Sequence, residues 1–315
     1  MPDKILVTGG AGFIGSHLVD DLAKRGHRVR ILDNFSTGRR ENLTRSLKKV
    51  QVIRGDVRDL RAVQKAAQGV ARVFHLAAVS SVPQSVDNPG PTWDANVGGT
   101  LNVLEAAREN DVPRVIFISS ASVYGAQRKV PFVESMTLRG SSPYATSKLV
   151  GEQFCELYGR LYGLETVALR LFSVYGPRQN PRSQYANVIP AFATLLLSGG
   201  TPTIYGTGRQ TRDFVFVEDV VRALRTAAYS RKLAGQVINV GTGQQTSVVG
   251  LLKSIQETLG TRAKPLYSPK KPGDDPRTCA DVRKARRLLG MRKMTPLQAG
   301  LRKTLTWFTT ESGSK

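Results

Sequence analysis

The chain has 315 residues, of which 40% are hydrophobic and 22% charged, so it has the composition of an ordinary globular protein of one large or two modest domains. Its apolar runs have the length of strands and it starts directly on a strand pattern, so we expect no membrane span, no signal peptide and a cytoplasmic location. The two cysteines, Cys155 and Cys279, are too few for a disulfide framework, and the three histidines are too dispersed to predict a metal site.

The chain is strongly basic, with 46 Lys and Arg against 24 Asp and Glu and a formal net charge of +22. Such a field attracts polyanions. The basic residues form only loose clusters, at Arg25–Arg30, Arg39–Arg40 and Lys284–Lys293, and aromatic side chains do not alternate with them as in binders of single-stranded nucleic acid. We therefore interpret the charge as a basic solvated surface with a few cations for phosphate-bearing ligands, and we expect no nucleic-acid partner.

The first half of the chain alternates short apolar runs with helical patterns. The run Lys4–Thr8 is rich in strand formers, and apolar residues then recur at helical spacing from Gly12 to Arg25, until Gly26 ends the helix. This alternation continues and predicts a parallel sheet with helices on both faces. The further strands are expected at Arg28–Leu32, Val50–Ile53, Val70–Ala78, Val115–Ser119 and Thr166–Leu171, and the further helices at about Thr92–Asn110 and Tyr144–Tyr162.

The pattern changes after about Ser173, where Gly and Pro turn signals accumulate. We predict a Rossmann-type, doubly wound α/β fold with a domain over residues 1–173, to which a segment near 235–245 returns as the strand Val237–Val240. Residues 174–315 are expected to form a smaller α/β lobe at the carboxyl edge of the sheet. Its helices are expected at Asn187–Ser198, Val217–Tyr229 and Val248–Leu259.

The segment Thr8–Gly15 (TGGAGFIG) has the pattern of a phosphate-binding turn. Gly10, Gly12 and Gly15 fit G-x-G-x-x-G, and starting from Gly9 the segment also fits G-x-x-G-x-x-G, between a strand and a helix. Glycines let the backbone approach a pyrophosphate, and the N-terminus of the helix offers free N–H groups and a positive dipole end. We therefore predict a dinucleotide-binding site here.

An acidic residue follows at the position that such a site needs. Asp33 ends the second strand, 18 residues after Gly15, and its carboxylate suits two ribose hydroxyls but would repel a 2′-phosphate. This favours NAD over NADP, although Arg39 and Arg40 keep NADP as an alternative. Asp56, after the third strand, is placed to contact the adenine edge.

A tyrosine precedes a lysine by four residues at Tyr144 and Lys148, so the two share one face of a helix. A tyrosine with its ordinary pKa of about 10 is a poor base at neutral pH. A nearby ammonium and a positive nicotinamide ring would favour the phenolate, which could then act as a general base toward an alcohol. A Tyr four residues before a Lys is a common pattern by itself. It indicates a catalytic pair here because a phosphate-binding turn precedes it in the chain.

Taken together, these motifs resemble the extended short-chain dehydrogenase/reductase family, the NAD-dependent epimerases and dehydratases, over nearly the whole chain. Within that family the chain is most similar to nucleotide-sugar 4-epimerases that take UDP-glucose or UDP-N-acetylglucosamine. The matching segments are Thr8–His17, Leu32–Gly38, Gly55–Asp59, His75–Ala78, Ser119–Gly125, Pro143–Lys148, Gly176–Gln179 and Arg212–Phe214.

The resemblance implies an isomerase that inverts C4 of a UDP-hexose through a 4-keto sugar, with NAD taking and returning the hydride. It implies that Tyr144 takes the proton of the 4-hydroxyl. Lys148 would bind the nicotinamide ribose and lower the pKa of the tyrosine. Ser120 would hydrogen-bond the same hydroxyl, with Ser122 as a second candidate. The cofactor residues it implies are Gly9, Gly12, Phe13, Ile14, Gly15, Asp33, Asn34, Thr37, Gly38, Asp56, Val57, Ala77, Ala78, Ser119, Tyr144 and Lys148.

The resemblance also places the nucleotide of the substrate. It implies that Asn187 and Val188 line the uridine site, Tyr205 stacks on the base, Arg212 and Lys271 meet the diphosphate, and Asp274 meets the ribose. Three positions depart from relatives, with Lys271 in place of Arg, Ser173 in place of Asn and Ser80 in place of Lys. The substrate residues implied are Ser81, Ser122, Ser173, Asn187, Val188, Tyr205, Arg212, Lys271, Asp274 and Thr278.

Sugar specificity is expected to depend on Thr278, which resembles the position beside the C2 substituent of the hexose. A bulky Tyr there would exclude an N-acetyl group, whereas Thr leaves room for either UDP-glucose/UDP-galactose or their N-acetyl counterparts. The segments Ser81–Ser85 and Tyr185–Pro190 are similar to enzymes that tolerate N-acetylhexosamines, and Val130–Phe132 is similar to UDP-glucuronate 4-epimerases.

The sequence leaves other functions open. The family's dehydratases and decarboxylases usually carry an acid where this chain has Ser122, which disfavours elimination. The remaining alternatives are a UDP-glucuronate 4-epimerase, another nucleotide-sugar oxidoreductase and a non-catalytic NAD-sensing Rossmann protein. The resemblance further implies a homodimer that pairs through the helices Thr92–Asn110 and Tyr144–Tyr162.

Overall fold

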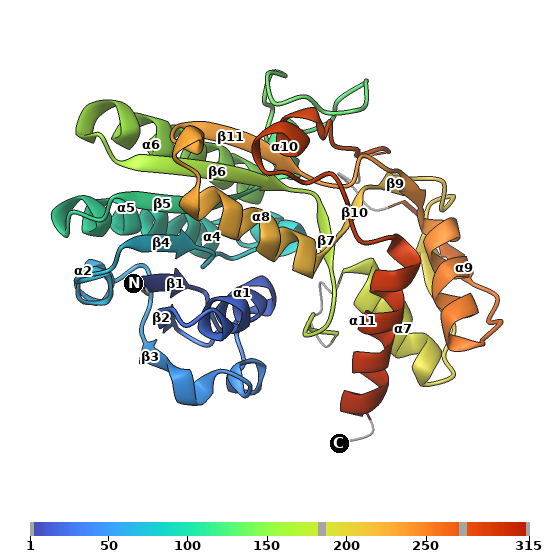
Figure 1. The fold of residues 1–315 in the computed structure, drawn as a ribbon. Coiled ribbons are helices and arrows are strands. Elements are labelled where there is room, and N and C mark those ends of the chain that lie inside the picture. The colour runs from blue at the N-terminus through green and yellow to red at the C-terminus, as the bar shows by residue number, and fades with distance from the viewer. Residues whose placement is uncertain (1–2, 182–186, 271–275, 313–315) are drawn as a thin grey trace.

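A parallel sheet of seven strands organises the protein (Figure 1), which was analysed as a computed structural model that describes residues 3–181, 187–270 and 276–312. The strand order is β11-β6-β5-β4-β1-β2-β3, so the direction of winding reverses between β1 and β4. The doubly wound α/β fold expected from the sequence is confirmed. The strands are β1 (Lys4–Thr8), β2 (Arg28–Asp33), β3 (Val50–Arg54), β4 (Arg72–His75), β5 (Arg114–Ser120), β6 (Glu165–Leu171) and β11 (Gln236–Val240).

Helices cover both faces of this sheet because each presents one apolar stripe to it. On one face lie α1 (Phe13–Lys24), α8 (Val217–Tyr229) and α10 (Arg283–Leu288), which share one core with the strands. On the other face lie α2 (Leu60–Ala67), α5 (Gly99–Glu109) and α6 (Pro143–Tyr162), with a second core. In α8 the stripe of Val220, Val221, Leu224, Ala227 and Ala228 has helical spacing and is buried throughout.

The helix expected over Thr92–Asn110 is instead built from three pieces, α4 (Pro89–Trp93), a π-helical turn η3 (Asp94–Gly98) and α5. The side chain of Asn96 explains the interruption, because its amide bonds both backbone groups of Val79 at 2.8 and 3.0 Å. It also donates to the Ser147 hydroxyl at 2.9 Å. A π-helical turn of this kind reorients one side chain within a helix and is frequent at functional sites.

The strand expected at Val70–Ala78 is shorter in the structure, because β4 ends at His75. The next residues leave the sheet and bend over β1, where Ala77 donates its N–H to the Thr8 hydroxyl at 3.2 Å. This bend opens the carboxyl edge of the sheet.

A further core lies beyond the carboxyl edge of the sheet and is formed by α7 (Val188–Leu197), α9 (Val248–Leu259) and α11 (Leu297–Ser312) with short strands, as Figure 1 shows. Helix α8 and strand β11 also belong to the second half of the chain, yet they pack on and pair with the main sheet. The division into residues 1–173 and 174–315 stays a prediction. The other α-helix and strands of the described residues are α3 (Val82–Asp87), β7 (Ser173–Tyr175), β8 (Thr203–Tyr205), β9 (Thr211–Arg212), β10 (Phe214–Phe216), β12 (Thr246–Ser247) and β13 (Leu266–Ser268), and short 3-10 helices lie at Arg40–Leu43, Leu47–Lys49, Ala121–Tyr124 and Arg231–Leu233.

None of the helices within residues 3–181, 187–270 and 276–312 is long and apolar enough to cross a membrane.

Because α8 packs on the main sheet, shortening one of its buried apolar side chains should have a large effect on the stability of the protein. Leu224 is fully buried, so Leu224→Ala should lower the free energy of unfolding by about 2–5 kcal/mol. Chemical denaturation of the purified protein measures this change. The matched control is Leu266→Ala in β13, where the residue is 61% exposed and the effect should be small. Equal effects of the two substitutions would contradict the packing described.

Candidate active site

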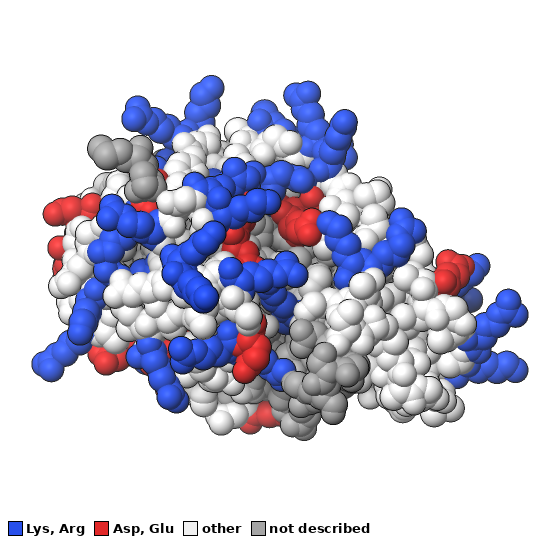
Figure 2. All heavy atoms as spheres, turned by 60° about the horizontal axis from the view of Figure 1, so that its bottom comes forward, with Lys and Arg blue, Asp and Glu red and all other residues white. Residues whose placement is uncertain are grey.

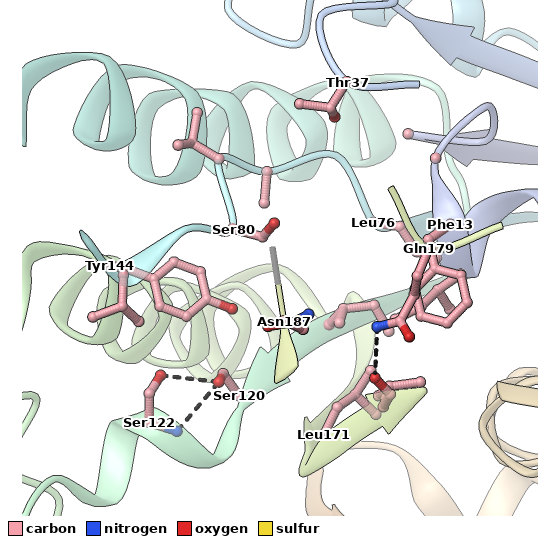
Figure 3. Close-up of a pocket in the computed structure, with 18 of the residues that line it drawn as sticks. Phe13, Thr37, Leu76, Ser80, Ser120, Ser122, Tyr144, Leu171, Gln179 and Asn187 are labelled. Atoms are coloured by element: carbon pink, nitrogen blue, oxygen red, sulfur yellow. Dashed lines mark hydrogen bonds between the residues drawn. The ribbon is translucent and has the colours of Figure 1, made fainter. Parts of the chain in front are cut away.

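A cavity of about 1010 Å³ runs along the carboxyl ends of the parallel strands and continues toward the core of α7 and α9. It crosses the point between β1 and β4 where the winding reverses, which is the usual ligand site of doubly wound sheets. Figure 3 shows Tyr144, Ser120 and Ser122 at one side of this cavity and Phe13 with Gln179 at the other. The cavity is therefore long enough to bring a glycine-rich turn and a tyrosine into one site.

The glycine-rich turn after β1 is closely packed. Gly9 has a φ of +69°, and a Cβ atom on it would lie 2.7 Å from the Ala77 nitrogen. A Cβ atom on Gly15 would lie 2.1 Å from the Gly9 oxygen. Helix α1 begins directly after Gly12 without a side-chain cap and without an acid in its first turn. Its N–H groups therefore remain available to an anion in the cavity.

Asp33 lies at the end of β2 as expected and faces the same cavity. Its two carboxylate oxygens accept the N–H groups of Ala11 and Phe35, each at 2.8 Å. Burial raises the pKa of Asp33, while these two hydrogen bonds act in the opposite direction. A Cβ atom on Gly38 would approach the carboxylate to 2.9 Å, so Gly38 keeps that side of Asp33 open.

Asp56 lines the same end of the cavity. It accepts a hydrogen bond from the Asn34 side chain at 2.8 Å and pairs with Arg58, also at 2.8 Å. The hydrogen bonds from Arg58 hold the pKa of Asp56 well below its usual range, so this carboxylate stays charged. Two acidic groups at one end of the cavity favour a ligand with hydroxyl or amine donors there.

Tyr144 and Lys148 point into the other end of the cavity from the first turns of α6. That helix starts where the Ser142 hydroxyl accepts the N–H of Ala145 at 3.1 Å and Pro143 occupies the first turn. The two functional side chains then follow at a spacing of four residues, on one face. This local start of the helix fixes their direction toward the ends of β5 and β6.

The ionisation of this pair is governed by burial and by its neighbours. Burial raises the pKa of Tyr144, and a hydrogen bond with Ser120 acts against this rise. Burial lowers the pKa of Lys148 to about 8. The ammonium donates to the Ile118 carbonyl at 2.9 Å and lies 5.1 Å from the centre of the Phe117 ring.

Ser120 ends β5 and lies beside Ser122, with 2.9 Å between their hydroxyl oxygens. The Ser120 oxygen also accepts the N–H of Ser122 at 3.2 Å, as Figure 3 shows. A phenol, an ammonium and two hydroxyls thus meet at one position, which is a suitable arrangement for moving the proton of an alcohol.

The cavity lining contains most of the residues that the sequence pointed to. Every cofactor residue named above lines it, and so do Ser122, Ser173, Asn187, Val188, Tyr205, Arg212 and Thr278. Ser81 lies beside the lining, and its hydroxyl accepts the N–H of Gln84 at 3.2 Å, where it caps α3. Lys271 and Asp274 lie outside the described residues, as does Tyr185. The roles of all these residues remain predictions.

Sequence reasoning missed several lining or supporting side chains. Gln179 lies beside Phe13 (Figure 3) and anchors its own loop, since its amide donates to Val174 O at 3.1 Å and accepts from Gly176 N at 3.3 Å. Ser85 accepts the backbone N–H of Tyr144 at 3.1 Å. Gln179 belongs to the matching segment Gly176–Gln179, so the sequence contained a signal that could have identified it. Ser85 contacts a distant part of the chain, and no sequence pattern indicates that contact.

Basic side chains do not gather on the cavity alone. Figure 2 shows one face of the molecule with Lys and Arg scattered over it and acidic and uncharged residues between them. No single basic stripe is visible on this face, which agrees with the interpretation of the charge as a solvated surface.

Known proteins share this sequence and architecture. Residues 5–241 match the sequence profile of the NAD dependent epimerase/dehydratase family. A UDP-glucose 4-epimerase of Mycolicibacterium smegmatis is 41% identical over 313 residues, covering 98% of this chain and 99% of that protein.

Two solved structures agree over almost the whole chain. The UDP-N-acetylglucosamine 4-epimerase from Methanobrevibacter ruminantium M1, in complex with UDP-N-acetylmuramic acid, has a TM-score of 0.94, 36% identity and coverage of 98% and 99%. The UDP-glucose 4-epimerase of Thermus thermophilus, in complex with NAD, has a TM-score of 0.89, 38% identity and coverage of 97% and 99%.

Proposed function

This chain belongs to the NAD dependent epimerase/dehydratase family, and we propose that within it the chain is an isomerase that inverts C4 of UDP-hexoses with NAD as cofactor. The observation that carries the proposal is the meeting of Ser120, Tyr144 and Lys148 in the cavity that also contains the glycine-rich turn. Relatives that are 36–41% identical over nearly the full chain support it, because they are UDP-glucose and UDP-N-acetylglucosamine 4-epimerases.

The residues present fit NAD. The bare N-terminus of α1 and the close backbone of Gly9–Gly15 suit its pyrophosphate, and Asp33 suits the hydroxyls of a ribose. Arg39 instead donates to Asn180 at 3.2 Å and is absent from the cavity lining, which favours NAD over NADP. When bound, NAD supplies a hydride acceptor that is regenerated within each turnover, so the net reaction is redox-neutral.

The chain's own residues handle the proton. Tyr144, as the phenolate, takes the proton of the sugar 4-hydroxyl and returns it when the inverted alcohol forms. Lys148 favours the phenolate through its positive charge, and Ser120 holds the sugar oxygen by a hydrogen bond. Ser122 stands where an acid would be needed for elimination, so the sugar keeps its remaining substituents.

The remaining part of the cavity is proposed to hold the UDP moiety. Asn187 and Val188, at the start of α7, and Tyr205, at the end of β8, line it and are assigned to the uridine. Arg212 lines the same part and is assigned to the diphosphate, whose charge it would balance. The cavity thus offers polar, aromatic and cationic groups that suit a uridine and a diphosphate.

A second copy of the chain is the proposed partner, paired through α5 and α6. Leu101 on α5 is 37% exposed, and Leu161 and Tyr162 at the end of α6 are 58% and 52% exposed. Apolar side chains of this size on neighbouring helices favour association of two copies.

Turnover of UDP-sugars tests the proposed function directly. The wild-type protein should interconvert UDP-glucose with UDP-galactose, or their N-acetyl forms, and Tyr144→Phe should lower kcat by about 100-fold or more because it removes the base. Product analysis by NMR measures the inversion at C4. A protein that retains NAD but inverts no sugar in a panel that includes UDP-glucuronate would support a non-catalytic NAD-binding protein instead.

Cofactor content tests the role of the glycine-rich turn. In Gly15→Ala the new methyl group would collide with the Gly9 oxygen, so the turn must open and the purified protein should contain far less NAD. Heat release of the cofactor followed by an enzymatic NAD assay measures this content. The control is Gly90→Ala in α4, where nothing lies within 4 Å of the added methyl group. Equal NAD content in both variants would argue against the turn as the cofactor site.

Sugar preference tests the role of Thr278, which lines the cavity and donates its N–H to Thr211 O at 3.1 Å, next to Arg212. Thr278→Tyr adds a ring that should exclude a 2-acetamido group but spare a 2-hydroxyl. We expect kcat/KM for UDP-N-acetylgalactosamine to fall at least about tenfold more than that for UDP-galactose. Parallel kinetics on the two sugars decide the matter, and an equal loss on both would remove Thr278 from the C2 position.

A further inference from the structure

One buried ion pair beside the active site takes no part in the mechanism described so far. Glu152 lies one turn after Lys148 on the same face of α6, and Arg170 lies on the neighbouring strand β6. Their side chains are only 6% and 4% exposed. The pair is bidentate, with 2.9 Å from Arg170 Nε to Glu152 Oε1 and 2.7 Å from Nη2 to Oε2. Burying two charges costs free energy, so such a pair needs a reason other than stability.

Glu152 also contacts the wall of the active site. Its Oε1 atom accepts a hydrogen bond from the hydroxyl of Ser119, which lines the cavity next to Ser120. The carboxylate therefore lies behind the lining, between the guanidinium of Arg170 and the part of α6 that carries Lys148. It can act on the site only through these neighbours, since Glu152 itself does not line the cavity.

Arg170 holds this carboxylate from a wider network. Its Nη1 atom donates to the Tyr124 hydroxyl at 2.9 Å, and that hydroxyl donates to Asn239 Oδ1 at 2.6 Å. Asn239 in turn donates to Phe132 O at 2.8 Å, and Phe132 N donates to Cys279 O at 2.7 Å, next to Thr278. Tyr124, which belongs to the matching segment Ser119–Gly125, therefore has a structural role, because it fixes the orientation of Arg170.

The charges around Lys148 show why the carboxylate matters. Among the described residues, the ammonium interacts electrostatically with Glu152 and Cys155 from α6 and with His75 from β4, and Arg170 from β6 is paired with Glu152. Burial lowers the pKa of His75 to about 3 and raises the pKa of Cys155, so both are neutral near pH 7. Of these four, only Glu152 is an anion, and its charge favours the ammonium form of Lys148.

We propose that Glu152 is a positioning residue, which keeps Lys148 in its charged form and fixes Ser119 in the cavity wall, while Arg170 holds the carboxylate in place. The inference rests on the proposed function, in which the ammonium of Lys148 favours the phenolate of Tyr144. Glu152 thus acts on the proton-transfer step without contact with substrate or cofactor.

The sign of the effect follows from electrostatics. Glu152→Gln keeps the shape and the acceptor oxygen for Ser119 but removes the negative charge. The buried ammonium then loses the anion that compensates it, so the pKa of Lys148 falls. A less charged Lys148 favours the phenolate less, and the pKa of Tyr144 therefore rises.

The experiment is a titration of the Tyr144 phenolate by its ultraviolet absorbance in the NAD-loaded protein, with Tyr144→Phe as the blank. In Glu152→Gln the midpoint should rise by about one pH unit or more. Where the phenolate is the minor form, kcat/KM should fall about tenfold per unit of this shift, with little change in KM. Glu152→Asp retains the charge and should return the midpoint most of the way to the wild-type value.

The matched control is Glu165→Gln. Glu165 pairs with buried Arg114 where β5 and β6 begin, whereas the active site lies at the other ends of these two strands. Losing that pair should lower stability without moving the midpoint. A Glu152→Gln protein that is folded and has the wild-type midpoint would make the pair purely structural and overturn the proposal.

Two further outcomes keep the proposal falsifiable. If Glu152→Gln does not fold, the titration of Glu152→Asp decides, and a midpoint raised by a unit or more despite the retained charge would overturn the proposal. The absorbance needs no sugar, so a midpoint shift in a protein that inverts no UDP-hexose would support the role of Glu152 toward Lys148 and refute only the proposed function.

Discussion

The close approach of backbone to backbone in the turn Gly9–Gly15 is the constraint on which the rest of the structure depends. A single methyl group on Gly15 would lie 2.1 Å from the Gly9 oxygen, and one on Gly9 would lie 2.7 Å from the Ala77 nitrogen. The turn therefore packs backbone against backbone, both within itself and against the residues that follow β4, and leaves no room for side chains at these two positions. Because it does so, the N-terminus of α1 stays bare and faces the cavity.

The second half of the site is built by charge and burial rather than by close backbone packing. Helix α6 carries a phenol and an ammonium on one face toward the hydroxyls at the end of β5, and the surrounding sheet keeps water from most of them. A buried cation is stable only where an anion compensates it. The proposed role of Glu152 joins these facts, since its carboxylate pairs with Arg170 and lies one turn from Lys148 on the same face of α6. In this proposal the chemistry of the cavity depends on a pair of side chains that do not line it.

Much of the fold and of the site could be predicted from the sequence, because local periodicity and motif spacing carry that information. The strand Lys4–Thr8 and the helices α8 and α9 have the expected bounds, and the cofactor residues line one cavity. The π-helical turn at Asp94–Gly98 could not be predicted, because it depends on contacts of Asn96 with Val79, 17 residues away.

Contacts between distant segments account for other features that the sequence did not predict. The packing of α8 on the main sheet and the pairing of Glu152 with Arg170 join parts of the chain that no local pattern links. Helix α11 (Leu297–Ser312) was not expected, although its residues form part of the core beside α7 and α9. For Ser81 the sequence pointed to the substrate, and the structure adds a second contact, because its hydroxyl accepts the N–H of Gln84 where it caps α3.

In the proposed reaction the hydride leaves C4 of the sugar and returns to the same carbon without leaving the active site. The most direct measurement uses UDP-glucose labelled with deuterium at C4, incubated with the protein in unlabelled water and an excess of free NADH. If the hydride returns in this way, the UDP-galactose formed should retain the deuterium at C4, with none in water or in the free cofactor pool. Loss of the deuterium to either pool would contradict it.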